Sequence, residues 1–136
     1  MKTSLLLAAV MGILLTGASV DAHHSFAAQY DANKKIEFTG AVTKVEWMSP
    51  HIFIYVDVKD ANGKVINYAV EGGAPTRLYR QGWAPDTLKI GNTVTVQGAL
   101  ARDGSPLVNA TTVSLNGRKL FAGTSNPNDA GAAPPK

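Results

Sequence analysis

The strongest constraint on the fold is an alternating segment at residues 51–59, His-Ile-Phe-Ile-Tyr-Val-Asp-Val-Lys, in which every second residue is aliphatic. Successive side chains of a β-strand point to opposite faces, so a period of two predicts a strand with one buried face. Phe53 and Tyr55 are expected on the face opposite to the core. A shift of one residue in the register would exchange the two faces. The side chains of this segment that we expect in the core are Ile52, Ile54 and Val56.

A tight turn is predicted directly after this strand, at residues 60–63 (Asp-Ala-Asn-Gly), because Asn-Gly favours the positive φ angles of a hairpin. The chain is expected to return as a strand over residues 64–71. A short helix is predicted over residues 74–82, since Pro75 suits a first helical turn and Gly82 suits a C-terminal stop. The remaining predicted strands cover residues 36–47, 93–99, 107–115 and a short edge at 118–121. Further core side chains are expected at Val94, Val96 and Val113.

This order of three strands, a helix and two strands predicts an all-β domain, and more specifically a small five-stranded OB-like Greek-key barrel. Gly40 lies inside the first strand, which indicates a bulge or bend of the kind that curls a sheet. An open sandwich of similar strands is the alternative. The sequence contains no cysteine, so the domain has to fold on its hydrophobic core without disulfides.

The first 22 residues have the outline of a secretory signal peptide. Met-Lys supplies a short positive start, residues 5–15 are apolar, and residues 20–22 (Val-Asp-Ala) form the expected cleavage boundary. Cleavage after Ala22 makes His23 the mature N-terminus; cleavage after Ala18 or Ser19 is the alternative. We therefore expect a bacterial protein that is periplasmic or secreted.

The mature chain is expected to contain one domain. Phe26 and Tyr30 are expected to pin an N-terminal arm onto it. The predicted boundaries are residues 23–35 for the arm, 36–123 for the barrel domain and 124–136 for a disordered tail.

Composition excludes several classes of function. The formal net charge of +3 is dispersed along the chain, which argues against a nucleic-acid partner. No second apolar segment reaches the length of a membrane span, so no stable membrane insertion is expected after processing. Without cysteine there is no thiolate metal site and no thiol nucleophile. No catalytic motif stands out, so we expect a protein that is not an enzyme, with a copper oxygenase as the enzymatic alternative.

Several long phrases carry a family resemblance: HHSFAAQYD, GAVTKVEWMSPHIFIYVDVKDANGKV, EGGAPTRLYRQGW, LKIGNTVTVQG and NGRKLFAGTS. Together they resemble the DUF6152 family of small exported bacterial proteins of unassigned function. The resemblance runs from about residue 23 to residue 125, and it implies export and a small β-barrel but no activity. The family's Trp-x-Asn-Pro-His phrase corresponds to residues 47–51, where Ser49 replaces the usual Asn.

A metal site is the sharpest functional hypothesis, and it rests on the three histidines of the chain. An N-terminal His23 would offer its α-amine and its imidazole to one ion, and His51 at the start of a rigid strand would complete a three-nitrogen copper site. His24 is a weaker candidate, because neighbouring residues in an extended arm point apart. Met48 lies close enough in sequence to favour Cu(I). The alternative is a solvated terminus and a histidine that only caps a strand.

A second hypothesis is an interaction module on the barrel face that carries Trp47, Phe53 and Tyr55. OB-folds use exposed aromatic rings for stacking, and a peptide, glycan or protein partner fits an exported protein better than nucleic acid does. Asp57 and Glu71 are expected to be neighbours across the hairpin, where two carboxylates are ordinary surface groups.

Overall fold

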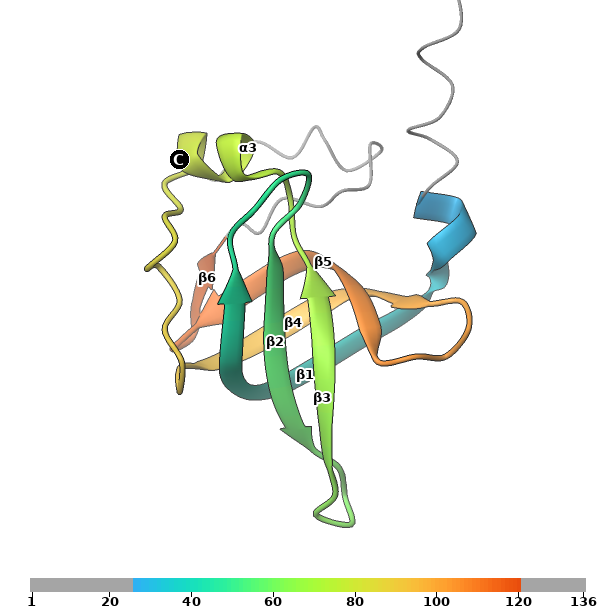
Figure 1. Ribbon diagram of the computed structural model, residues 1–136. Coiled ribbons are helices and arrows are strands. Elements are labelled where there is room, and N and C mark those ends of the chain that lie inside the picture. Colours follow the sequence, from blue (N-terminus) through green and yellow to red (C-terminus); the bar gives the residue numbers. More distant parts are fainter. Residues whose placement is uncertain (1–25, 121–136) are drawn as a thin grey trace, which may run out of the picture.

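The computed structural model describes residues 26–120, which form six strands and two short helices (Figure 1). A helical turn over residues 26–29 precedes the first strand and was not predicted. The remaining elements, in chain order, are β1 (Tyr30–Glu46), β2 (Phe53–Lys59), β3 (Val65–Glu71), α3 (Pro75–Arg80), β4 (Thr93–Ala101), β5 (Leu107–Leu115) and β6 (Arg118–Leu120).

The strands form one sheet in the order β3-β2-β1-β4-β5-β6, in which neighbours are antiparallel. A further parallel pairing joins Ala69–Glu71 of β3 to Leu107–Asn109 of β5. This pairing closes a hydrogen-bonded ring of five strands, and β6 continues beyond it at the edge of β5. The domain is mostly β, in agreement with the prediction, and α3 lies between β3 and β4 as predicted.

Strand β1 is long and bent, since its first part pairs with β4 and its last part pairs with β2. The bend depends on Gly40, where an added Cβ would lie 2.2 Å from the backbone carbonyl oxygen of Asp57. Gly98 of β4 has the same relation to the carbonyl oxygen of Asn109 of β5, also at 2.2 Å. Glycine is required at both positions because any side chain would collide with the backbone of the neighbouring strand.

β1 begins at Tyr30 rather than at residue 36, so the second half of the predicted arm belongs to the sheet. Tyr30 pairs with Ala101 of β4, and the Arg102 amide donates a hydrogen bond to the carbonyl oxygen of Gln29 at 3.0 Å. The polar stretch at residues 31–35 (Asp-Ala-Asn-Lys-Lys) has no apolar alternation, which is why its strand conformation was missed.

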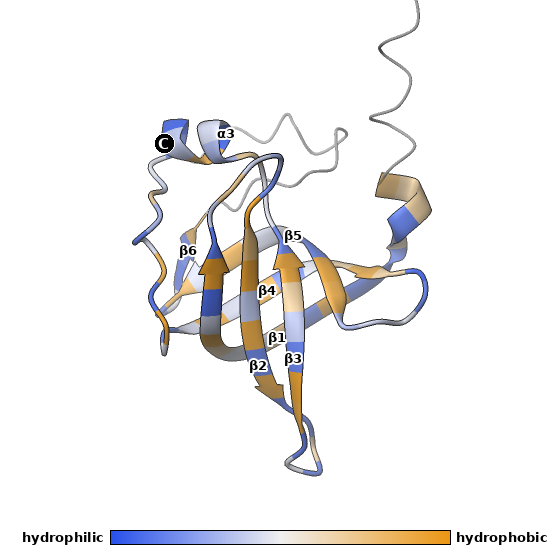
Figure 2. Cartoon of the chain, viewed as in Figure 1, coloured by the Kyte–Doolittle hydropathy of each residue, from blue (hydrophilic) through white to orange (hydrophobic). Residues whose placement is uncertain are grey.

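The core fills the ring, and the predicted strand register is confirmed. Each of the six aliphatic side chains expected inside is 0–1% exposed: Ile52, Ile54, Val56, Val94, Val96 and Val113. Figure 2 shows hydrophobic and hydrophilic residues alternating along β2. Phe53 and Tyr55 lie on the outer face and are half-buried. Leu78 of α3 and Trp83 after it are buried and join the core.

No helix within residues 26–120 has the length and apolar character needed to cross a bilayer. The predicted signal peptide (residues 1–22) and tail (residues 124–136) lie outside the described residues.

Candidate functional site around His51

His51 lies in the connection between β1 and β2, next to the end of β3. Two backbone hydrogen bonds place it there: the Ile52 amide donates to Gly73 at 3.1 Å, and the Gly72 amide donates to Ile52 at 2.9 Å. The Nδ1 atom of His51 is 2.7 Å from Oε1 of Glu71, and about a third of the His51 side chain (34%) is exposed. The histidine is therefore fixed on one side and open to solvent on the other.

Glu71 is the buried centre of this site, since it is only 7% exposed. Its second oxygen, Oε2, accepts a hydrogen bond from the hydroxyl of Tyr30, which is 1% exposed. Burial raises the pKa of the Tyr30 phenol well above its ordinary value, and the hydrogen bond to Glu71 raises it further. The phenol therefore stays protonated and remains a donor to the carboxylate at neutral pH.

Glu71 is not the ordinary surface group expected from the sequence, and Asp57 is not its neighbour. Asp57 accepts a hydrogen bond from Nδ2 of Asn67 at 2.7 Å, on an exposed part of the hairpin. The register pairs Glu71 with Phe53 instead. Tyr30 and His51 cover the Glu71 carboxylate, so its burial comes from segments that are distant in sequence.

This contact decides which nitrogen of His51 faces outward. Carboxylate oxygens only accept hydrogen bonds, so Nδ1 carries a proton when it contacts Glu71. The lone pair of the neutral ring is then on Nε2, which is the atom that can bind an external group. Within residues 26–120 no three His, Cys, Asp or Glu residues come together to hold a metal ion. The other predicted ligands, His23 and His24, lie outside the described residues.

A hollow of about 270 Å³ lies beside His51, on the outer face of β2. It brings His51 together with Phe53 and Tyr55, two of the residues predicted to bind a partner, and with Met48, which is 58% exposed. The remaining lining residues are Glu46, Ser49 and Pro50. One predicted metal ligand and two of the three predicted partner-binding residues therefore line the same hollow.

Tyr55 is held at the wall of this hollow by two charged neighbours on β1. Its hydroxyl donates to Oε2 of Glu46 at 3.0 Å, and the Lys44 ammonium lies 5.2 Å from the centre of its ring. Lys44 and Glu46 also form an ion pair. The hydrogen bonds from Lys44 and Tyr55 lower the pKa of Glu46, and the bond to Glu46 raises the pKa of Tyr55.

Trp47, the third residue predicted to bind a partner, is placed differently. Its ring packs edge-on against Tyr79 of α3, with ring centres 5.6 Å apart, and it does not line the hollow. Its indole Nε1 is buried without a hydrogen-bond partner in the described part of the chain. Trp47 therefore packs half-buried between the β1–β2 connection and α3.

Sequence reasoning pointed to Tyr30 but treated Glu71 as an ordinary surface group. The expectation that Phe26 and Tyr30 pin the arm is confirmed, since Tyr30 is buried and the two ring centres are 5.4 Å apart. The role of Tyr30 as a donor to Glu71 was not predicted, because the two residues are brought together only by closure of the ring.

A family model matches residues 12–109 of the chain, and its description is a family of unknown function, DUF6152. The chain belongs to the DUF6152 family. The resemblance read from the sequence is thereby confirmed. No curated protein matches the chain. Membership in DUF6152 supplies no activity, so the function has to be argued from the site.

Proposed function

We propose that this DUF6152 protein is an exported, non-catalytic copper-binding protein that holds one Cu(II) ion between His51 and its mature N-terminus. The ligands are Nε2 of His51, the α-amine of His23 and the imidazole of His23. His24 is the auxiliary ligand, through its ring or its backbone amide. The proposal depends on signal-peptide cleavage after Ala22, because only then does His23 carry a free amine.

The observation that carries the proposal is the 2.7 Å contact between His51 and the buried carboxylate of Glu71. A histidine that binds a metal through one ring nitrogen usually donates the other N–H to a carboxylate or carbonyl, which fixes the tautomer and the ring orientation. Tyr30 in turn holds Glu71. His51 thus has the support that a metal ligand needs.

The course of the arm supports the same proposal. Tyr30 bonds to the second oxygen of the carboxylate that holds His51, and Phe26 packs on Tyr30. Only residues 23–25 separate a mature N-terminus from Phe26. Three extended residues span at most about 11 Å, so the proposal requires the His23 amine to reach Nε2 of His51 from Phe26 within that length.

Copper fits this ligand set better than other first-row metals do. Imidazole and amine nitrogens suit Cu(II), which also binds more tightly than the other divalent ions in the Irving–Williams order. The chain contains no cysteine, so a thiolate site of the kind that favours zinc is not available.

The test is a Cu(II) titration of protein purified from the cell envelope, after its intact mass has shown that it starts at His23. A matched protein with one extra glycine before His23 keeps every side chain but turns the amine into an amide. Loss of a residue that supports a metal ligand usually lowers metal affinity about 10- to 100-fold. We expect the extra glycine and His51→Ala each to lower Cu(II) affinity by more than this. His24→Ala is expected to have a smaller effect. Equal affinity of the extended and native-start proteins would reject the proposal.

We also infer that the five-strand ring is an OB-like Greek-key barrel. The pairing order around the ring, β1-β2-β3-β5-β4, and the position of α3 between β3 and β4 support this assignment. The parallel contact of β3 with β5 is its most informative part. The Ala69 amide donates a hydrogen bond to the Pro106 carbonyl oxygen at 2.9 Å, so it should be protected in NMR hydrogen exchange. Free exchange of this amide with solvent would contradict closure of the ring.

A second candidate function is an interaction module for a peptide, glycan or protein. The half-buried rings of Phe53 and Tyr55 in the wall of the hollow favour it. This function requires those two rings but not the amine of His23. A partner that binds His51→Ala as well as it binds the native protein, and is lost in Phe53→Ala, would favour this function over copper binding.

A further inference from the structure

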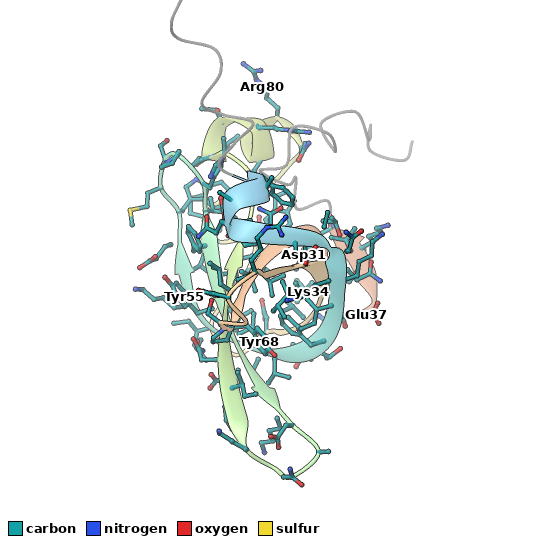
Figure 3. All side chains as sticks on the ribbon, turned by 90° about the vertical axis from the view of Figure 1, so that its right-hand side faces the viewer. Asp31, Lys34, Glu37, Tyr55, Tyr68 and Arg80 are labelled. Atoms are coloured by element: carbon teal, nitrogen blue, oxygen red, sulfur yellow. The ribbon has the colours of Figure 1, made fainter. Side chains whose placement is uncertain are left out.

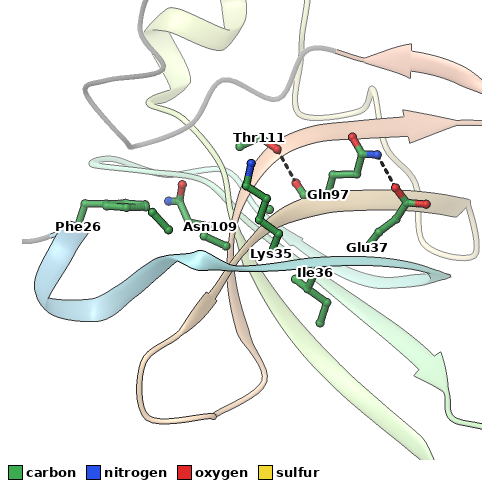
Figure 4. Close-up of a pocket in the computed structure, with 10 residues that line it drawn as sticks. Phe26, Lys35, Ile36, Glu37, Gln97, Asn109 and Thr111 are labelled. Atoms are coloured by element: carbon green, nitrogen blue, oxygen red, sulfur yellow. Dashed lines mark hydrogen bonds between the residues drawn. The ribbon is translucent and has the colours of Figure 1, made fainter.

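A larger hollow, of about 560 Å³, lies on the outer side of β1, β4 and β5 (Figure 4). It shares no lining residue with the hollow at His51. Figure 3 shows Tyr55, which lines the smaller hollow, and Glu37, which lines the larger one, on opposite sides of the molecule. The larger hollow is lined by Phe26, Ala32, Lys35, Ile36, Glu37, Gln97, Gly98, Ala99, Asn109 and Thr111.

Two irregularities in strand pairing create this hollow. Tyr30 pairs with Ala101 and the next paired residue, Lys35, pairs with Ala99, so residues 31–34 leave the regular ladder. On the other side of β4, the register shifts at Gly98, and Thr111 becomes an extra residue of β5. Bulges of this kind often lie next to binding and active sites, because they redirect side chains.

The polar side of the hollow is preorganised by Gln97. Its amide nitrogen donates to Glu37, and its side-chain oxygen accepts from Thr112 at 2.8 Å. Its backbone oxygen accepts from the hydroxyl of Thr111 at 3.1 Å. Because both ends of the Gln97 side chain are engaged, the Glu37 carboxylate is held at the wall of the hollow.

Lys35 and Glu37 supply opposite charges to this wall. They are two residues apart on β1, and Figure 4 shows both side chains on the same side of the strand, with Ile36 on the other. In the part of the chain that the structure describes, neither residue takes part in an ion pair. An ammonium and a carboxylate therefore lie on the same wall of the hollow, and the carboxylate is bonded to Gln97.

The far end of the hollow is apolar and is formed by the arm. The ring of Phe26 lies there beside Asn109, which is buried (Figure 4). Phe26 packs on Tyr30, and Nε of Arg102 donates to the carbonyl oxygen of Ala27 at 2.5 Å, which fixes the helical turn. Ala32 and Ala99, which have small side chains, also line the hollow.

We propose that this hollow binds a zwitterionic small molecule of the α-amino-acid class with an apolar side chain. The ligand carboxylate pairs with Lys35, its ammonium pairs with Glu37, and its side chain packs against Phe26. A volume of about 560 Å³ lies within the range of roughly 300–1,000 Å³ that is usual for small-molecule sites. The hollow shares no lining residue with the one at His51, so this proposal does not rest on copper binding.

The test is an NMR titration of the metal-free mature protein with L-phenylalanine. Two analogues that each lack one charge serve as comparison ligands: 3-phenylpropionate lacks the ammonium, and 2-phenylethylamine lacks the carboxylate. We expect saturable shifts of the backbone amides of Gly98, Asn109 and Thr111 with the amino acid, and much weaker shifts with either analogue.

Variants of the two charged residues complete the test. Lys35→Gln and Glu37→Gln are each expected to weaken binding by about fivefold, the upper range for a solvent-exposed ion pair. The matched control is Lys34→Gln, which removes the same charge from a neighbouring exposed residue that does not line the hollow. Equal binding of an analogue, unchanged affinity in both variants, or no saturable shift at these amides would each overturn the proposal.

Discussion

Tyr30→Phe is the most informative single substitution, because it removes one hydroxyl from the centre of the structure and leaves the ring. The phenylalanine ring fills the same space, so no cavity forms and the packing of Phe26 on residue 30 is preserved. What is lost is the hydrogen bond to Oε2 of Glu71.

The stability lost in Tyr30→Phe depends on the burial of Glu71, which accepts the hydrogen bond. Glu71 is 7% exposed, so water replaces the lost hydroxyl poorly. Hydrogen bonds to charged groups contribute about 1.5–3 kcal/mol, and we expect Tyr30→Phe to lower the free energy of unfolding by about 2 kcal/mol. For a domain of this size that corresponds to a fall in Tm of about 10 °C.

The pH dependence gives a second and more specific signature. Burial and the bond to Glu71 raise the pKa of folded Tyr30 above its unfolded value near 10. The stabilisation is therefore fully present below pH 10 and is lost as the pH rises beyond it, because the unfolded chain releases the proton first. Between pH 9 and pH 11 the wild-type protein should lose about 1.3 kcal/mol more than Tyr30→Phe does.

Urea unfolding followed by the fluorescence of buried Trp83, at pH 9 and pH 11, measures both quantities. Tyr79→Phe is the matched control, since Tyr79 is exposed on α3 and should show neither effect. A stability difference that is the same at both pH values, or a loss below about 0.5 kcal/mol at pH 9, would refute the role given to the hydroxyl.

Three further substitutions test other parts of the structure. Glu71→Gln should lower Cu(II) affinity about tenfold by weakening the support of the histidine ligand, and a change below twofold in a copper titration would contradict this. Gly40→Ala should destabilise the fold by about 2–3 kcal/mol in urea unfolding, because its Cβ would lie 2.2 Å from the Asp57 carbonyl oxygen; wild-type stability would count against the close approach. Tyr55→Phe should cost less than about 0.5 kcal/mol in the same assay, because its bond to Glu46 is near the surface; a larger loss would mean that the bond is more than a surface contact.

The sequence predicted the strands correctly where a strand has one buried face. Alternation at residues 51–58 predicted the register of β2 correctly, and the turn at residues 60–63 predicted the hairpin with β3. It failed at the start of β1, where the polar residues 31–34 leave the regular pairing with β4 and show no apolar alternation. A strand segment without a buried face carries no period of two, so no local signal marks it.

The candidate site, too, was only partly predictable from the sequence. His51 could be selected from the sequence because histidine is rare in this chain and because the residue begins a clear strand. The partnership of Glu71 with Tyr30 spans 41 positions and exists only after the ring closes. Neither residue type is unusual at its position, so only the folded structure connects them.

The start of β1 joins the two hollows, although they share no lining residue. Phe26 forms the apolar end of the larger hollow, and Tyr30, on which it packs, bonds to the carboxylate that holds His51. Lys35→Gln changes a charge in the larger hollow alone, whereas Tyr30→Phe removes the bond to Glu71 and keeps the packing of Phe26. We therefore expect Tyr30→Phe to lower Cu(II) affinity and to leave amino-acid affinity unchanged, and a fall in both affinities would mean that the Tyr30 hydroxyl also positions the arm.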